Sequence, residues 1–356
     1  MGPPHRGRLR RAADGRPDRH RDHRRRPRSR PERGDGVTFS ADALRGRSVQ
    51  VKVPATSANL GPGFDTLGLA LALYDELQVS VRDEPGATVE VIGVGAGEVP
   101  TDETNLVVRA IAHTFESVGH PLPGLSLVAR NSIPHGRGMG SSGAAIVSGI
   151  MAAKGLLEGV VEFDAQSLLA LANDMEGHPD NVAPALFGGL TIAWVTPEGP
   201  QFKKLIVHRG VSPLVLVPSH VMSTALARSL QPESVPHEDA VFNVSRSALL
   251  VAALIQSPEL LHAATEDKLH QSYRASAMPE TNRLITLLRA RGFAAVVSGA
   301  GPSILVLCSD PSQRLAAAEL VASEAETDWK PLMLAVDFKG ATVTPLAVES
   351  ADTPAA

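Results

Sequence analysis

Residues 133–145 read IPHGRGMGSSGAA: three glycines at alternate positions, then two serines and a run of small residues. Gly136, Gly138 and Gly140 let backbone amides approach a ligand closely, because glycine has no Cβ. The small residues predict a helix over 141–157 whose free N–H groups and positive dipole end point at the glycine loop. Such a place suits phosphate. No lysine follows the glycines, so the Walker A pattern GxxxxGK[ST] is absent.

Ser141 and Ser142 add two hydroxyls at the start of this predicted helix. They can bind phosphate, or a phosphate-bound Mg²⁺ that takes one or two protein oxygens and completes its shell with water and phosphate. The alternative interpretation is an ordinary glycine loop in which a serine caps the helix. Of the two, the pattern favours phosphate binding.

Two further glycine-rich segments flank this loop in the sequence. Residues 53–65 read VPATSANLGPGFD and hold two polar side chains, Asn59 and Asp65, in a loop shaped by glycine and proline. Residues 298–303 read SGAGPS and connect two short apolar stretches. Taken alone, each segment is adequately explained as a turn.

The rest of the chain alternates strand and helix patterns, which predicts a mixed α+β fold without repeats. Prolines and glycines cluster over 197–213, and we therefore expect an N-terminal lobe over 47–205, a C-terminal lobe over 206–345 and a tail over 346–356. Strands are predicted at 48–53, 67–81 (one long strand or two broken at Asp75), 88–94, 125–129, 190–195, 204–207, 214–217, 294–297, 304–307 and 333–336. Helices are predicted at 104–118, 141–157, 165–175, 224–230, 239–255, 280–291 and 313–325.

Composition excludes several classes of protein. The 356 residues are 43% hydrophobic and 20% charged, which is typical of a globular protein. The single cysteine, Cys308, excludes a disulfide scaffold and a cysteine-based metal cluster. No apolar run approaches the roughly 18 residues that a membrane span needs. We expect a soluble, cytoplasmic protein.

The first 36 residues differ from the rest. They contain thirteen arginines, no lysine and five acidic residues, although the whole chain has a net charge of −4. With almost no apolar side chains they cannot bury enough surface to offset the entropy of ordering, so we predict a disordered basic extension over 1–46. It is either an arm that binds nucleic acid or a dispensable extension. No aromatic residue alternates with the arginines, which favours the second; we expect neither nucleic acid nor membrane as a partner.

Together the glycine-rich segments resemble a known family. PATSANLGPGFD (54–65), IPHGRGMGSSGAA and SGAGPS occur in the order typical of the galactokinase, homoserine kinase, mevalonate kinase and phosphomevalonate kinase (GHMP) superfamily. The first of these and EGHPDNVAPALFGGL (176–190) resemble the homoserine kinase branch specifically. The resemblance covers about 51–336. It implies a ribosomal protein S5 domain 2-like N-terminal lobe, a ferredoxin-like C-terminal lobe and a homodimer.

The resemblance also implies an activity: phosphorylation of the side-chain hydroxyl of L-homoserine by ATP with Mg²⁺, in threonine biosynthesis. ATP would bind at Asn105, near the adenine, and along the central loop. Ser142 and Glu176 would be the metal ligands. The loop residues implied are Pro134, His135, Gly136, Arg137, Gly138, Met139, Gly140, Ser141 and Ser142.

The substrate has an ammonium, a carboxylate and a hydroxyl, and the sequence offers partners for each. By resemblance Asn59 and Asp65 would hold the amino group, and Arg228 and Arg274 the carboxylate, for which a planar guanidinium is well suited. Near the reacting hydroxyl the resemblance implies three catalytic residues, Glu176, Asp180 and Asn181. His178, Thr224 and Gly299 would complete the substrate site.

Two other classes of function stay open on the sequence. Another small-molecule kinase of the superfamily would keep the central loop, but the homoserine-type motifs argue against it. A non-catalytic relative would be expected to lose Ser142, Glu176 or Asp180, and all three are present.

Overall fold

The structure, a computed structural model, describes Gly2 and residues 41–346. Most of the predicted extension over 1–46, and the tail beyond 346, lie outside the described residues. The part of the extension that is described is folded: Ala41–Leu44 form a 3₁₀ turn, η1, and Leu44 is fully buried. The folded lobe therefore begins before residue 47.

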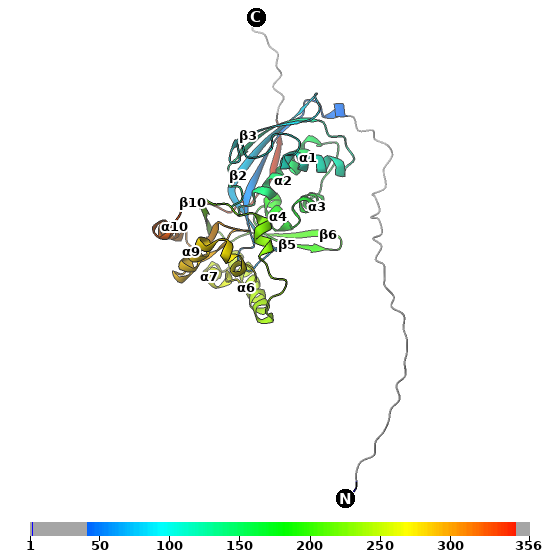
Figure 1. Cartoon of the computed structure of the whole chain (residues 1–356). Helices are drawn as coiled ribbons and strands as arrows, with labels where there is room; N and C mark the ends of the chain where they lie inside the picture. The colour runs from blue at the N-terminus through cyan, green and yellow to red at the C-terminus, as the bar shows by residue number, and fades with distance from the viewer. Residues whose placement is uncertain (1, 3–40, 347–356) are drawn as a thin grey trace. The chain divides into compact units, whose positions relative to one another are not determined.

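A seven-stranded sheet forms the first lobe (Figure 1). Its main path runs β11-β1-β2-β4-β3, and β5 and β6 extend it from β2. Of the described pairs, only β3 and β4 run parallel, and helix α1 (Leu106–Ser117) lies between them in sequence. The strands are β1 (Ser48–Ala58), β2 (Leu67–Arg82), β3 (Ala87–Gly93), β4 (Gly124–Asn131), β5 (Leu190–Thr196), β6 (Gly199–Leu205) and β11 (Thr342–Pro345).

Three helices cover this sheet: α2 (Ser141–Leu156), α3 (Ala165–Glu176) and α4 (Pro179–Phe187). Most residues of α2 are buried, and its small side chains allow the helix to pack among α1, β1 and its neighbours. The sequence predicts no helix at 179–187, because two prolines indicate a turn. In the structure Pro179 occupies the first turn, where no N–H is needed, and the helix forms.

The second lobe contains a four-stranded antiparallel sheet of order β10-β7-β9-β8. Along the chain β7 is followed by helices, then β8 and β9, then α10 and β10, which is the βαββαβ order of a ferredoxin-like lobe. The strands are β7 (Ser212–Pro218), β8 (Ala294–Val297), β9 (Ile304–Cys308) and β10 (Trp329–Met333). The helical elements are α5 (Thr224–Ser229), α6 (His237–Ile255), η2 (Pro258–Leu260), α7 (Leu261–Ala264), α8 (Gln271–Arg274), η3 (Ala275–Ala277), α9 (Pro279–Ala290) and α10 (Ser312–Glu324).

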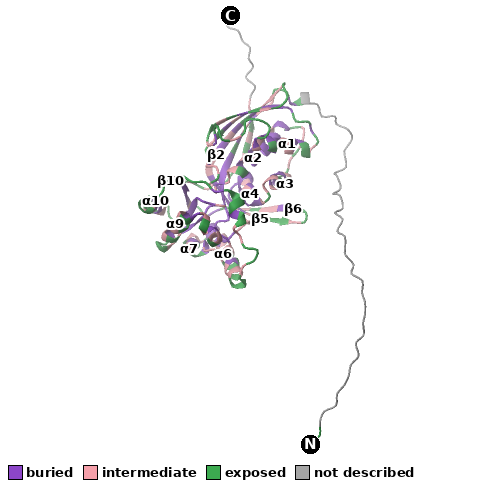
Figure 2. Ribbon diagram, in the orientation of Figure 1, coloured by how far each residue is buried: buried purple, intermediate pink, exposed green. Residues whose placement is uncertain are grey.

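The second sheet is buried on both faces. Leu214 and Leu216 of β7 belong to a core that α9 and α10 cover, while Val215 and Val217 belong to the main core with α6. This alternation follows from the two-residue period of a strand. Figure 2 shows the outer surfaces of α6 and α10 as exposed.

The chain returns to the first sheet at its end. The last predicted strand, 333–336, lies instead at Trp329–Met333, and strand β11 is not predicted at all. β11 pairs with β1, with Val49 opposite Pro345, and Leu71 forms a bridge with Val336. The predicted C-terminal lobe over 206–345 therefore contributes its last residues to the first lobe. β6 is likewise displaced, from the predicted 204–207 to Gly199–Leu205.

No helix in the described part of the chain is both long enough and apolar enough to cross a bilayer.

Candidate active site

The three glycine-rich segments meet at the junction of the two lobes. Ser298 Oγ lies 2.7 Å from the carbonyl oxygen of Gly138 and 2.9 Å from Ser57 Oγ. Asn59 Nδ2 donates to the carbonyl of Gly299 at 2.9 Å. These hydrogen bonds join segments more than a hundred residues apart in sequence, so each loop fixes the shape of the other two.

The glycines permit this close approach. A Cβ on Gly138 would lie 2.0 Å from the Ser298 carbonyl oxygen, and one on Gly140 would lie 1.9 Å from Thr56 Oγ1. Both glycines also have positive φ, at 68° and 69°. Gly140 is the N-cap of α2, so the loop leads directly to the N–H groups and positive end of that helix.

A cavity of about 190 Å³, which we call the charged cavity, lies at this junction. Its lining includes every residue for which the resemblance implies substrate binding, although these come from both lobes. It also includes the three glycines and two serines of the central loop, and the three implied catalytic residues. The lining residues are Asn59, Asp65, Gly136, Gly138, Gly140, Ser141, Ser142, Glu176, His178, Asp180, Asn181, Met222, Ser223, Thr224, Arg228, Arg274, Gly299, Ala300 and Gly301.

Two of the lining charges face each other across the lobes. Arg228 Nη1 and Nη2 lie 3.2 and 3.0 Å from the carboxylate oxygens of Asp65, a two-point pair. Both side chains are partly exposed, at 40% and 37%. Solvent screens such a pair, and its net contribution to stability is small.

Arg274 presents a different environment. It is only 2% exposed, its Nε has no hydrogen-bond partner among the described residues, and burial lowers the pKa of its guanidinium. Its Nη1 makes one long contact, 3.4 Å, with the Gly299 carbonyl. A buried cation with unused donors at the wall of a cavity is a site for an anion.

The loop that carries Asn59 and Asp65 is strained. Asn59, Leu60 and Asp65 have φ values of 69°, 52° and 51°, the left-handed region that side chains with a Cβ disfavour. Such residues cost about 1–3 kcal/mol each and persist only where surrounding contacts hold them. Asn59 supplies one such contact, because its Oδ1 accepts from the Asp65 backbone N–H at 2.9 Å.

Helix α4 delivers Asp180 and Asn181 to the cavity. Gly68 of β2 permits this, because a Cβ there would lie 2.0 Å from the Asp180 carbonyl oxygen. Asp180 is 2% exposed, and its Oδ1 lies 2.6 Å from His178 Nδ1. Burial lowers the pKa of His178, but the hydrogen bond and charge of Asp180 outweigh it and the pKa is raised. Thr56 Oγ1 donates to Asn181 Oδ1 at 2.9 Å.

Glu176 and Ser142 lie together beside the first turn of α2. Ser142 Oγ donates to Glu176 Oε2 at 3.0 Å. Burial raises the pKa of the Glu176 carboxyl, against the opposing effects of His178 and Ser142. The half-buried carboxylate of Glu176 and the exposed hydroxyl of Ser142 are oxygen donors of the kind that Mg²⁺ takes when phosphate fills its remaining positions. No cluster of three or more acidic, His or Cys side chains suited to a metal occurs among the described residues, so a metal here would depend on this pair and the phosphates.

A second cavity, of about 230 Å³, lies on the other side of the same helix turn. We call it the apolar cavity. Ser141 and Ser142 line both cavities, and His135 and Asn105 line this one. The Asn105 side chain is the N-cap of α1, accepting from the Val107 N–H at 2.9 Å, and its Nδ2 donates to the Pro100 carbonyl. The other lining residues are Asp75, Glu76, Leu77, Val91, Val99, Pro100, Leu106, Val107, Ala129, Asn131, Ala145 and Ser148.

Three predicted ATP-binding residues line neither cavity. Arg137 donates to the backbone carbonyls of His135, Pro218 and Ser219, so its guanidinium ties the loop to the end of β7. Met139 is 1% exposed and packs in the core. Pro134 lies beside Arg137 in a separate surface depression. For Arg137 and Met139 in particular, the side chains have structural contacts in place of a ligand-facing position.

The sequence reasoning missed two groups of lining residues. Met222, Ser223, Ala300 and Gly301 belong to the charged cavity, and the last two lie inside the SGAGPS segment already singled out. The hydrophobic residues of the apolar cavity carry no signal, because in sequence they are indistinguishable from residues of a buried core.

Comparison with known proteins agrees with this geometry. Residues 105–189 match the model of the GHMP kinases N-terminal domain, and residues 249–326 match that of the GHMP kinases C-terminal domain. A homoserine kinase from Leifsonia xyli subsp. xyli is 87% identical over 307 residues, which cover 86% of this chain and 95% of that protein. One from Streptomyces coelicolor is 48% identical over 313 residues, covering 88% and 99%.

A solved structure shares the fold. The crystal structure of homoserine kinase from Cytophaga hutchinsonii superimposes with a TM-score of 0.75 at 27% identity, covering 83% of this chain and 97% of that one. The two domain matches, the two-lobed fold and the high identity over most of the chain lead to one conclusion. The chain belongs to the GHMP kinases and, within them, to the homoserine kinase family.

Proposed function

We propose that this enzyme transfers the γ-phosphoryl group of ATP to the side-chain hydroxyl of L-homoserine. One observation carries the substrate assignment: the charged cavity places Asp65 and two arginines, 228 and 274, around a space of amino-acid size beside the glycine loop. Membership of the homoserine kinase family supports the same substrate.

The charges would recognise the zwitterion by exchanging partners. In the structure Asp65 and Arg228 pair with each other. Homoserine brings an ammonium for Asp65 and a carboxylate for Arg228 and Arg274, so both charges of the pair stay neutralised when the substrate enters. An analogue that lacks either group leaves one protein charge unpaired, and sites of this kind reject such analogues strongly.

Asp180 and Asn181 would position the hydroxyl. Both line the cavity near the start of α2, and His178 and Thr56 fix their side chains. Phosphoryl transfer passes through a loose transition state, so alignment of the hydroxyl contributes more than a strong base. We therefore assign Asp180 to accepting and orienting the hydroxyl hydrogen.

The central loop and the N-terminus of α2 would hold the phosphates, with the adenine in the apolar cavity. A kinase that uses ATP requires a divalent metal, and we propose Mg²⁺ bound by Ser142 Oγ and Glu176. When bound, the ion neutralises charge on the phosphates. We further propose, from family membership, that the enzyme is a cytoplasmic homodimer.

The test is ADP release by the full chain with ATP and Mg²⁺, comparing L-homoserine, mevalonate, galactose and no acceptor. Release with L-homoserine alone is the expected result. An Asp180→Asn variant serves as the matched control for contaminating kinase activity. Turnover on another acceptor, or on none, would contradict the proposal.

A further inference from the structure

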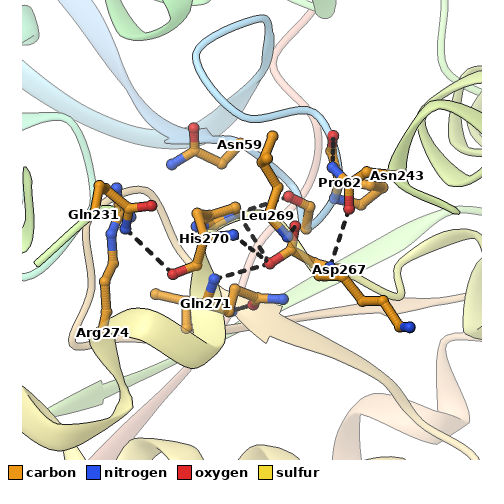
Figure 3. A network of polar contacts seen from close by, with 12 residues as sticks. Asn59, Pro62, Gln231, Asn243, Asp267, Leu269, His270, Gln271 and Arg274 are labelled. Atoms are coloured by element: carbon orange, nitrogen blue, oxygen red, sulfur yellow. Dashed lines mark hydrogen bonds and ion pairs between the residues drawn. The ribbon is translucent and has the colours of Figure 1, made fainter. Parts of the chain in front are cut away.

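A buried polar cluster lies behind the charged cavity, in the second lobe (Figure 3). Its members are Asn243 of α6, and Asp267 and His270 just before α8. Asn243 is 4% exposed, His270 is fully buried, and the Asp267 side chain is fully buried. None of the three lines the charged cavity. Buried polar groups on this scale require an explanation, because desolvating them is costly unless each has a specific partner.

Their partners include the strained substrate loop of the first lobe. His270 Nε2 lies 2.7 Å from the Gly61 carbonyl oxygen. A carbonyl only accepts, so Nε2 carries the proton. Burial lowers the pKa of His270, against the opposing effect of the Asp267 carboxylate, whose Oδ2 lies 3.8 Å from Nε2. His270 Nδ1 has no partner among the described residues, and the ring stacks on Phe64 with centroids 4.9 Å apart.

Asn243 holds the next peptide of the same loop. Its Nδ2 donates to the Pro62 carbonyl at 3.0 Å, and its Oδ1 accepts from the Lys268 N–H at 3.0 Å. Side chains of the second lobe thus hold the loop between Asn59 and Asp65 through two successive carbonyl groups, those of Gly61 and Pro62. These two bonds, together with the Asn59–Asp65 bond inside the loop, restrain the segment in which three non-glycine residues lie in the left-handed region.

The same cluster holds the helix that carries Arg274. Asp267 accepts from the backbone N–H groups of Leu269, His270 and Gln271 at 3.0, 3.1 and 2.8 Å, which fixes the turn into α8. Gln271 Oε1 in turn accepts from the Val297 N–H of β8 at 2.6 Å. One short segment, 267–274, therefore connects the loop bearing Asp65 to the helix bearing Arg274.

We propose that His270 is a positioning residue for the amino-acid substrate: through the Gly61 carbonyl it sets the distance between Asp65 and Arg274, and so the fit of the substrate's ammonium and carboxylate. The proposal rests on the proposed function of the charged cavity. The proposed effect concerns homoserine and not the nucleotide. The residues that line the apolar cavity come from 75–148, and none of them belongs to the buried polar cluster.

The experiment compares His270→Leu with His270→Gln. Leucine removes the donor, while the Nε2 amide of glutamine is as many bonds from the backbone as the ring Nε2 and restores it. We expect His270→Leu to raise the homoserine KM roughly 10- to 100-fold, the effect of an ångström-scale misplacement, with the ATP KM changed less than about twofold. His270→Gln should recover most of the loss.

His120→Leu is the matched control. His120 is also buried, at 4% exposure, bonds the Pro121 carbonyl through its ring at 2.9 Å and touches Phe115 edge-on, but it lies in the first lobe away from both cavities. It should lower stability without changing either KM. If His270→Leu does not fold, His270→Asn, whose amide ends one bond short of the Gly61 carbonyl, is expected to show the same rise in the homoserine KM.

Unchanged KM values in folded His270→Leu or His270→Asn, or an equal rise in the KM values for homoserine and ATP, would overturn the proposal. Failure of the wild-type chain to phosphorylate homoserine would count against the proposed function instead. In that case amide hydrogen exchange decides the inference: peptides spanning 59–65 should exchange faster in His270→Leu than in His120→Leu, and equal rates would overturn it.

Discussion

The charged cavity and the apolar cavity share the first turn of α2 but are built in different ways. The charged cavity draws its lining from residues 59–301, across both lobes, and six of its side chains are ionisable: Asp65, Glu176, His178, Asp180, Arg228 and Arg274. The apolar cavity is built from residues 75–148 of one lobe, and half of its lining residues are Val, Leu, Ala or Pro. Selectivity for a small zwitterion requires charges placed from several directions, whereas a flat aromatic base requires only a slot.

The difference has an energetic side. Asp180 and Arg274 are buried and Glu176 is half-buried, and the fold must offset the desolvation of these ionisable groups. The hydrophobic part of the apolar cavity's lining costs little, because such residues are stable there in any case, although burial also raises the pKa of Asp75 in this cavity. We therefore expect substitutions in the charged cavity to change activity more than those in the apolar cavity do. Their effect on stability should be smaller, and some should even raise it.

Arg274→Leu should separate the two cavities most clearly. Arg274 lines the charged cavity and its Nε has no hydrogen-bond partner among the described residues, so its loss would remove one of the two partners that we propose for the substrate carboxylate. We expect the homoserine KM to rise roughly 1,000-fold or more, with the ATP KM nearly unchanged in steady-state assays. Arg274→Lys keeps the charge without the two-point geometry, so its homoserine KM should lie between those of the wild type and Arg274→Leu. A homoserine KM that stays at the wild-type value would refute the assignment.

Asp180→Asn tests the chemical step within the charged cavity. It retains the volume, removes the negative charge and disturbs the 2.6 Å contact with His178. We expect kcat to fall roughly 100- to 1,000-fold, with both KM values within about threefold, in single-turnover and steady-state measurements. A loss confined to the ATP KM would instead place Asp180 on the nucleotide side.

Ala145→Leu is the counterpart in the apolar cavity. The added side chain would occupy space in the cavity that we propose for the adenine, and we expect the ATP KM to rise about tenfold, the effect of one misfit apolar group. The homoserine KM should not change. Ala145→Ser, which adds little volume, is the control. If both KM values rose together, the two cavities could not be regarded as separate subsites.

Glu176→Gln should show how much folding stability the desolvated Glu176 carboxylate costs. Because burial raises its folded-state pKa, Glu176 binds its proton more tightly when folded, and the wild type loses stability as pH rises from the unfolded pKa through the folded one. The variant escapes this loss. Without metal or ATP, we expect its Tm to exceed that of the wild type by roughly 1–3 °C at pH 8.

The Tm difference between Glu176→Gln and the wild type should become smaller at low pH. Below the unfolded pKa both states bind the proton, so near pH 4 the Tm advantage of Glu176→Gln should be smaller than at pH 8. An advantage that grew as pH fell would contradict the direction assigned to the Glu176 pKa.

Sequence reasoning performed differently on the two cavities, for a physical reason. Asp65, Arg228 and Arg274 carry charges within recognisable motifs, and the structure brings them to one cavity; their roles stay predictions. Val91 and Ala129 look like core residues because Ala129 belongs to the main core and Val91 packs against it, although both also border the apolar cavity. Only the three-dimensional arrangement distinguishes them.

The fold shows the same division. Long periodic segments such as α1, α2 and α6 are predicted to within a few residues. Helix α4 is missed because its prolines indicate a turn when tertiary packing is ignored. β11 is missed because its four residues have no periodicity of their own and become a strand only by pairing with β1. The Asp65–Arg228 ion pair also cannot be predicted from the sequence, since its two residues lie in different lobes and are 163 positions apart in the chain.

The pairing of β1 with β11 has a consequence for biosynthesis. Val49 emerges from the ribosome early, but its partner Pro345 follows almost 300 residues later. At roughly 5–20 residues per second, the first sheet waits about 15–60 s for its edge strand. During that interval β1 presents unpaired backbone groups, which are a template for wrong strands. Completion of the first lobe is thus a late event in the synthesis of the chain, although its sequence comes first.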